Sequence, residues 1–143
     1  MVIAVIGENC SGKSTLANEI RQAVGAEIIT GKDYIRLAKS ESEAERLFVT
    51  KLKNAVSGEN IIYVISEKDQ LDFLPDGAVR ILVKTDIETI KERFKKRMRG
   101  NLPAPVEQML IAKHGMFDNG TYNFTFDGSS SDYSEICDAI KRL

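Results

Sequence analysis

Short apolar runs alternate along the chain with longer segments in which apolar residues recur every three or four positions. The runs are rich in β-branched residues and lack a polar face, which is typical of strands in a parallel sheet covered on both sides. They predict four strands, at residues 2–6, 27–30, 61–65 and 79–83. A fifth strand is predicted at residues 122–127, where Tyr122, Phe124 and Phe126 alternate with polar residues.

Helical periodicity predicts one helix from Thr15 onward and another with its apolar stripe between Ala44 and Val56. Ser42 and Glu45 have the spacing of a capping box at the start of the second helix. Gly58 is a suitable residue for its end, because glycine readily adopts the left-handed conformation that closes helices.

The second half of the chain continues the alternation. Thr85 and Glu88 form another predicted capping box, ahead of apolar positions at Ile87, Ile90, Phe94 and Met98. A short helix is predicted at residues 106–113. A last helix, capped near Asp132, places three residues on the sheet, namely Ile136, Ile140 and Leu143. Strands alternating with helices predict an α/β fold, a parallel sheet with helices on both faces.

Size and charge narrow the class of protein. The chain has 143 residues, which we interpret as a single domain. A formal net charge of −1 makes nucleic acid an unlikely partner, and no run is long enough to span a membrane. The two cysteines suggest neither a disulfide framework nor a metal site. With no signal sequence, we expect a cytoplasmic protein.

The first strand runs directly into Gly7-Glu8-Asn9-Cys10-Ser11-Gly12-Lys13-Ser14, which has the pattern G-x-x-x-x-G-K-S of a phosphate-binding loop. The glycines allow amide groups to point at a polyphosphate, Lys13 supplies a cation for its outer phosphates, and the Ser14 hydroxyl is a ligand for Mg²⁺. The helix that follows favours anions at its N-terminus. We therefore expect ATP or GTP with Mg²⁺, bound by Gly7, Asn9, Cys10, Ser11, Gly12, Lys13, Ser14 and Thr15.

Two acidic residues follow strands at the edge where a nucleotide would lie. Asp33 comes after the second strand and is a candidate to support Mg²⁺ or to accept a proton from an attacking hydroxyl; the alternative is that it caps the next helix. Glu67 comes after the third strand, where phosphate-loop proteins usually carry a metal-supporting aspartate. Its alternative is a solvated loop of mixed charge.

A basic run between Lys84 and Arg99 offers arginines that could neutralise a transferring phosphate. Arg93 and Arg97 are four positions apart on one helix side, and Arg99 closes the run. Much of the run is also consistent with a solvated helix face. His114 is the only histidine, and a lone histidine is more often structural than catalytic.

Taken in order, these features resemble the nucleoside monophosphate kinase-like family, which includes adenylate, cytidylate, shikimate and gluconate kinases. The resemblance implies a three-layer phosphate-loop fold with a five-stranded sheet ordered 2-3-1-4-5. It also implies an acceptor-binding helical region at about residues 32–57 and a lid at about 97–118, with Arg97 and Arg99 as lid arginines. The chain departs from shikimate kinase at Ser66-Glu67-Lys68, where that enzyme has a glycine-rich turn.

The leading hypothesis is an ATP-dependent kinase that phosphorylates a nucleoside monophosphate or a hydroxylated metabolite, working as a monomer or weak homodimer. Its predicted catalytic residues are Lys13, Asp33, Arg97 and Arg99, with Ser14, Asp33 and Glu67 around the metal. The alternative is a nucleotide-binding regulator or degenerate kinase without efficient turnover. A kinase acting on nucleic-acid ends is a third reading, which the net charge disfavours.

Overall fold

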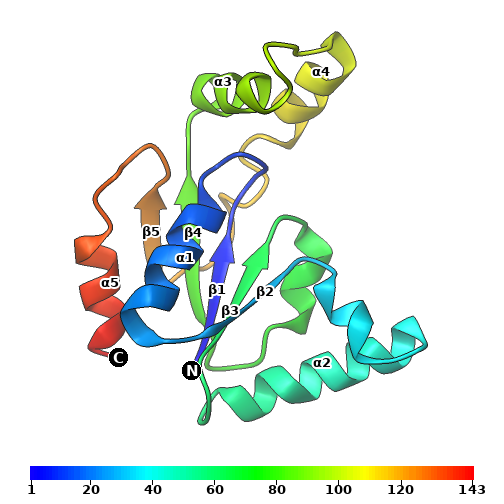
Figure 1. Ribbon diagram of the computed structural model, residues 1–143, viewed down its shortest axis with the longest axis vertical. Coiled ribbons are helices and arrows are strands. Elements are labelled where there is room, and N and C mark those ends of the chain that lie inside the picture. Colours follow the sequence, from blue (N-terminus) through cyan, green and yellow to red (C-terminus); the bar gives the residue numbers. More distant parts are fainter.

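The computed structural model describes residues 1–143 and contains one five-stranded sheet in the order β2-β3-β1-β4-β5. All neighbouring strands pair in parallel, so their carboxyl ends lie along a single edge (Figure 1). The predicted fold class and strand order are therefore confirmed. The strands are β1 (Val2–Ile6), β2 (Glu27–Thr30), β3 (Ile61–Ile65), β4 (Val79–Lys84) and β5 (Phe124–Asp127).

Five α-helices and two short 3₁₀ helices connect the strands. The α-helices are α1 (Lys13–Val24), α2 (Glu41–Ala55), α3 (Ile87–Arg97), α4 (Ala104–Lys113) and α5 (Ser134–Lys141). The 3₁₀ helices are η1 (Asp33–Leu37) and η2 (Lys68–Phe73). None of these helices combines the length and the apolar composition that a membrane crossing requires.

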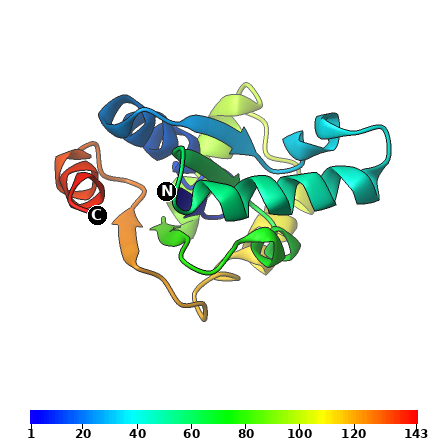
Figure 2. The same ribbon diagram turned by 90° about the horizontal axis from the view of Figure 1, so that it is seen from below.

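The buried residues form a core on each face of the sheet. Side chains alternate along β1, so that Ala4 and Ile6 join one core while Ile3 and Val5 join the other. The first core includes residues of α2, and the second lies under α1 and α5. Seen from below, α5 and α2 occupy opposite ends of the molecule (Figure 2). Because α2 covers one face of the sheet and α1 and α5 cover the other, the molecule has the expected three layers, helix, sheet and helix.

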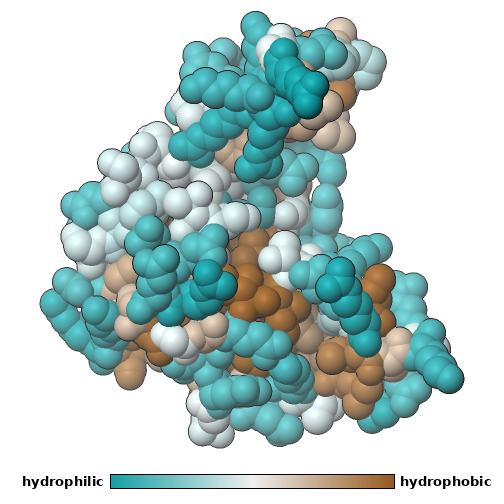
Figure 3. Space-filling model, in the orientation of Figure 1, coloured by the Kyte–Doolittle hydropathy of each residue, from teal (hydrophilic) through white to brown (hydrophobic).

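The pair α3–α4 projects beyond the carboxyl edge of the sheet, as Figure 1 shows. We call residues 87–113 the hairpin. A small separate cluster joins the hairpin to the phosphate loop, formed by Cys10, Ile90 and Leu110. In Figure 3 the hairpin is mostly hydrophilic on α3, whereas hydrophobic atoms reach the surface at α4, where Ile111 is exposed.

Several predicted helix ends were wrong by a few residues. Helix α2 begins after Ser40, whose side chain accepts a hydrogen bond from the Glu43 amide, in place of the predicted cap at Ser42. Helix α3 is capped by Asp86, one residue after Thr85. In each case the preceding polar residue has the extended backbone that a cap needs.

The end of the chain also differs from the prediction. Strand β5 begins at Phe124, two residues later than expected, and Leu143 is exposed and does not pack on the sheet. Helix α5 begins after Tyr133, which provides no side-chain cap, and the predicted Asp132 lies one residue earlier, where its carboxylate accepts hydrogen bonds from the amide and hydroxyl of Ser134. The short helix predicted at 106–113 is confirmed and starts two residues earlier.

Candidate phosphate-binding site

The predicted phosphate loop connects β1 to α1 at the carboxyl edge of the sheet. The chain turns sharply here because two residues take left-handed backbone conformations, Gly12 at φ 101° and Cys10 at φ 63°. Gly7 allows a close approach within the loop, since a Cβ at that position would lie 2.5 Å from the Ser11 hydroxyl. The Ser11 hydroxyl is buried and has no hydrogen-bond partner in the protein.

Backbone amides of the loop are free to bind an anion. The amides of Gly12, Lys13, Ser14 and Thr15 donate to no acceptor in the chain, and Gly12 provides no side-chain cap for α1. Free amides at a helix N-terminus carry partial positive charge and favour phosphate. The backbone thus has the donor arrangement that the motif predicts.

Lys13 is the first residue of α1, at the end of this loop, and is buried. Its Nζ donates a hydrogen bond to the Glu8 carbonyl oxygen at 3.0 Å. The pKa of Lys13 is lowered to about 8, mainly by burial and in part by the positive charge of Arg97, whereas Cys10 and Glu8 act in the opposite direction. The ammonium group is therefore poorly solvated, and an anion beside it would restore its usual preference for the charged form.

Three residues far away in the sequence support the back of the loop. The Thr85 hydroxyl donates to the Ser11 carbonyl oxygen at 2.7 Å. The Arg93 guanidinium donates to the carbonyl oxygens of Cys10, at 3.2 Å, and Gly128, at 2.7 Å. Gly128 packs so closely that a Cβ there would collide with Ser11 and Thr85. Arg93, one of three arginines considered as phosphate ligands, thus binds the loop backbone.

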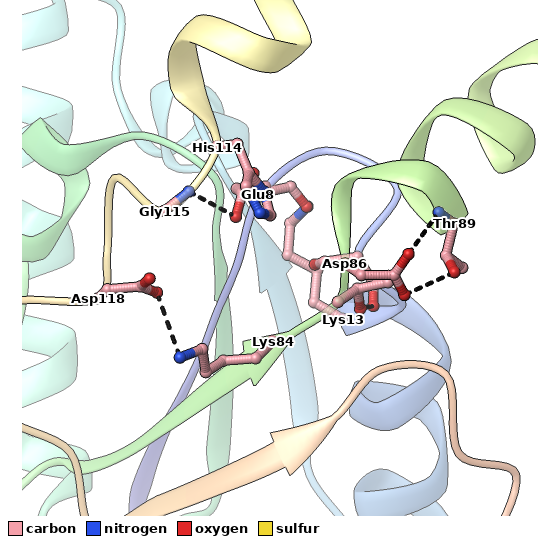
Figure 4. Close-up of polar contacts among 10 residues, drawn as sticks. Glu8, Lys13, Lys84, Asp86, Thr89, His114, Gly115 and Asp118 are labelled. Atoms are coloured by element: carbon pink, nitrogen blue, oxygen red, sulfur yellow. Dashed lines mark hydrogen bonds and ion pairs between the residues drawn. The ribbon is translucent and has the colours of Figure 1, made fainter.

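Glu8 links the loop to the end of the hairpin. Its carboxylate lies 2.9 Å from His114 Nδ1 and accepts a hydrogen bond from the Gly115 amide at 3.2 Å (Figure 4). His114 therefore has a structural contact, in line with the more common role of a lone histidine. The same residue, Glu8, contacts Lys13 through its carbonyl oxygen, so the lid segment and the phosphate loop meet at Glu8.

The two predicted acids occupy different surroundings. Asp33 is exposed after β2, and its carboxylate accepts a hydrogen bond from the Thr30 amide at 3.3 Å. Glu67 forms a capping box with Gln70 and an ion pair with Lys113 at 3.3 Å. No group of three His, Cys, Asp or Glu side chains is placed to hold a metal ion. Metal support by Asp33 and Glu67 stays a prediction.

The two predicted lid arginines are also placed differently. Arg97 lies near enough to Lys13 to affect its pKa. Arg99 is exposed at φ 57° and borders an open hollow on the hairpin with Glu92, Lys95 and Lys96. The structure thus brings Arg97, but not Arg99, toward the phosphate loop.

Sequence reasoning missed Glu8, Thr85 and Gly128 as parts of the site. Glu8 occupies a variable position of the motif, and Thr85 was interpreted as a helix cap. Gly128 follows the last strand as an ordinary turn residue. Their roles depend on which strands become neighbours in the sheet, which no local pattern reveals.

No protein-family model and no curated protein sequence matches the chain. Its fold, however, matches several solved structures at low sequence identity. A sugar kinase from Janibacter sp. HTCC2649 is 18% identical with a TM-score of 0.64, over 99% of this chain and 92% of that one.

Two further structures match over nearly their full lengths. Shikimate kinase from Bacteroides thetaiotaomicron is 16% identical with a TM-score of 0.64, covering 100% of this chain and 95% of that one. Deoxyadenosine kinase from M. mycoides, solved with bound dATP, is 20% identical with a TM-score of 0.57, covering 99% and 97%. The fold of this chain is that of the small phosphate-loop kinases.

Proposed function

We propose that this protein is a phosphotransferase that moves the γ-phosphoryl group of ATP to a small-molecule acceptor. The observation that carries the proposal is the phosphate loop itself, where free amides at the start of α1 surround the buried Lys13. The fold supports the proposal, because sugar, shikimate and deoxyadenosine kinases share it. We propose ATP rather than GTP as the phosphoryl donor, and a comparison of the two nucleotides tests this choice.

In the proposed reaction, the loop amides and Lys13 hold the β- and γ-phosphates, and Arg97 closes over the transferring group. The acceptor oxygen forms a bond to the γ-phosphorus while the bond from that phosphorus to the bridging oxygen of ADP breaks, and ADP leaves with the electron pair. The hydroxyl proton passes to a carboxylate, for which the sequence predicts Asp33.

The residues present fit a magnesium ion bound mainly through the nucleotide. Ser14 is exposed in the first turn of α1, its hydroxyl makes no hydrogen bond, and oxygen ligands are those that Mg²⁺ prefers. Mg²⁺ would neutralise part of the phosphate charge there. Asp33 and Glu67 are proposed to act on its water shell, because no protein carboxylate cluster is available.

A nucleotide-binding regulator without efficient turnover is the second candidate. The observation favouring it is that Glu67, at the position of the usual metal-supporting acid, is engaged by Lys113 and by its own capping box. Such a protein would bind ATP through the same loop but release little ADP in the presence of any acceptor.

The test is ADP release from ATP·Mg²⁺ or GTP·Mg²⁺ with a panel of hydroxylated acceptors and nucleoside monophosphates. Lys13→Ala serves as the inactive variant, and Lys53→Ala, on the exposed side of α2, as the matched control. Stimulation that Lys13→Ala abolishes and Lys53→Ala retains would support the kinase. Tight ATP binding without stimulation by any acceptor would favour the regulator.

A further inference from the structure

A glutamine that follows β3 uses only half of its side-chain amide group within the protein. Gln70 is the third residue of η2 and is 5% exposed. Its Oε1 accepts hydrogen bonds from the backbone amides of Ser66, at 3.1 Å, and Glu67, at 3.3 Å, whereas its Nε2 donates to no acceptor. Among buried side-chain atoms only the Ser11 hydroxyl lacks both a partner and access to solvent, so Nε2 reaches the solvent.

The two backbone bonds fix the direction in which the Gln70 amide points. A backbone N–H group needs an oxygen as its acceptor, so Oε1 must face Ser66 and Glu67 and the NH₂ group must face the other way. A flipped amide would place N–H groups against N–H groups. In the observed orientation a Cβ added at Gly31 would meet only one atom within 4 Å, the Gln70 Nε2 at 3.6 Å. The NH₂ group is therefore turned toward the carboxyl end of β2.

This donor lies at the same edge of the sheet as the phosphate loop. The Gly31 amide donates to the Val64 carbonyl oxygen at 2.9 Å, and the Gly7 amide donates to the Ile65 carbonyl oxygen at 3.2 Å. Strand β3 thus connects the end of β2, the Gln70 amide and the first residue of the loop (Figure 1). Neighbouring strands are about 4.8 Å apart, so the donor is within reach of a small molecule whose hydroxyl approaches a phosphate on the loop.

Gly31 keeps the space beside the donor open. Its φ of 53° lies in the left-handed region, which glycine adopts without strain. The Tyr63 hydroxyl donates to the Gly31 carbonyl oxygen at 2.9 Å and so holds this peptide group in one orientation. Because residue 31 has no Cβ, the NH₂ group of Gln70 stays uncovered on that side.

The charges at this edge give little preference for an anion or a cation. Exposed charged residues follow both strands, namely Lys32, Asp33, Glu67, Lys68 and Asp69. From the hairpin, Lys113 pairs with Glu67 at 3.3 Å. A buried amide discriminates more strongly than these exposed charges, because a bound molecule without an oxygen at that place would leave the NH₂ group unpaired and cut off from water.

We infer that Gln70 is a specificity-determining residue for the phosphoryl acceptor and that its Nε2 donates a hydrogen bond to an oxygen of that molecule. The inference rests on the proposed kinase function and names a group that the acceptor must carry. Besides the hydroxyl that is phosphorylated, the acceptor has an oxygen with a free lone pair, as in a second hydroxyl, a carbonyl or a carboxylate. The acceptor then lies over the ends of β2 and β3, on the side of Asp33.

Gln70→Glu tests the inference directly, because it separates the two halves of the amide. The glutamate carboxylate can accept the same two bonds from Ser66 and Glu67, but it has no N–H to donate. We expect the acceptor KM to rise about tenfold or more while the affinity for ATP stays within about twofold. Gln22→Glu, on the exposed side of α1, makes the same chemical change elsewhere and should alter neither quantity.

The kinetic measurement uses whichever of D-gluconate, shikimate, D-glucose and AMP most stimulates ADP release from ATP·Mg²⁺. Gln70→Met loses both halves of the amide and shows what a purely structural role would do, namely lower the urea midpoint. An unchanged acceptor KM in Gln70→Glu would overturn the inference. A rise in KM with an equal loss of ATP affinity would overturn it as well, since the phosphate loop itself would then be displaced.

A second experiment needs neither a variant nor turnover. The side-chain NH₂ group of Gln70 gives its own pair of signals in the ¹⁵N-labelled protein, which its proximity to Gly31 identifies. Each of the four compounds is added to saturation together with Mg²⁺ and the non-hydrolysable analogue AMP-PNP. We expect at least one compound to shift the Gln70 signals and to leave those of Gln22 unchanged. Unchanged Gln70 signals with all four would refute the inference.

The two proposals fail in different ways. If a compound shifts the Gln70 signals but none stimulates ADP release, the ligand contact at Gln70 holds and the kinase function is wrong. If an acceptor stimulates ADP release that depends on Lys13, while Gln70→Glu retains the acceptor KM and the Gln70 signals do not move, the kinase function holds and Gln70 is only structural.

Discussion

Lys13 keeps an ammonium group at a position that is only 7% exposed. Its pKa falls from 10.5 to about 8, mainly through burial. Between these two values the unfolded chain binds more protons than the native protein, so the contribution of Lys13 to stability improves as the pH rises from about 8 to 10.5. Below pH 8 the native state bears the whole cost of the buried charge.

Replacing Lys13 by methionine should therefore stabilise the protein without nucleotide. We expect the free energy of unfolding at pH 7 to increase by about 1–3 kcal/mol, and the gain to shrink toward pH 10. Urea denaturation of both proteins at pH 7 and pH 10 measures this. Lower stability of Lys13→Met at pH 7 would mean that the hydrogen bond to Glu8 outweighs the cost of burial.

Gly128 and Gly25 allow the cost of a steric collision to be compared with the cost of an unfavourable backbone conformation. An alanine Cβ at Gly128 would collide with Ser11 and Thr85, whereas at Gly25 it would meet no atom within 4 Å and only the positive φ of 67° would resist it. We expect Gly25→Ala to cost about 1 kcal/mol and Gly128→Ala about 2–3 kcal/mol. Gly128→Ala should also weaken ATP binding, since it displaces the phosphate loop.

Urea denaturation and ATP titration of the two glycine variants give this comparison. A Gly128→Ala protein that binds ATP as tightly as the unchanged protein would show that the loop does not depend on this contact.

Among the elements, α3 acts on the phosphate loop through Arg93. Arg93→Met removes hydrogen bonds to two carbonyl oxygens, of Cys10 and Gly128. We expect a loss of about 2 kcal/mol in the free energy of unfolding and a weaker affinity for ATP, because the loop loses its connection to the β5–α5 turn. Lys96→Met, exposed on the same helix, is the control and should change neither quantity.

Calorimetric titration with ATP and urea denaturation are measured for the Arg93→Met and Lys96→Met proteins. Together they distinguish support of the phosphate loop by Arg93 from a direct contact with the transferring phosphate. Loss of turnover with unchanged ATP affinity and stability would instead indicate that Arg93 contacts the transferring phosphate.

The hydrophobic pattern predicted every strand, because β1, β3 and β4 contain continuous apolar runs, whereas β5, at the edge of the sheet, alternates apolar and polar residues. Helix starts were less predictable. Ser40 and Ser42, or Thr85 and Asp86, are all residues that cap helices, and the backbone conformation decides which one does.

The site was predictable only where its residues are contiguous. The phosphate loop is encoded in one stretch, so its position could be inferred from spacing alone. Arg93 was identified as part of the site, but its partners are backbone carbonyl groups, which no side-chain pattern marks. A cavity of about 620 Å³, bounded by the phosphate loop, β4, β5 and the segment after α4, exists only once those segments are neighbours.

At the scale of the whole molecule, the hairpin is joined to the body by the cluster of Cys10, Ile90 and Leu110, by the hydrogen bonds of Arg93 and by the ion pair of Lys113 with Glu67. The bonds of Glu8 hold the residues that follow it, His114 and Gly115. Leu110→Ala should loosen this joint while leaving both sheet cores intact. We expect amide exchange in α3 and α4 to become about tenfold or more faster, with little change in β1 and β3. Hydrogen exchange followed by mass spectrometry tests this, and uniform acceleration throughout the chain would contradict it.

The support behind the phosphate loop also has a consequence for the order in which the molecule assembles. The loop begins at the seventh residue, yet the contact of Gly128 with Ser11 requires β5 to have joined the edge of the sheet. Contacts so distant in sequence form late, since long chain segments must first be closed. During synthesis, the phosphate loop would thus gain this support, and with it the proposed affinity for ATP, only after β5 has emerged and joined the sheet.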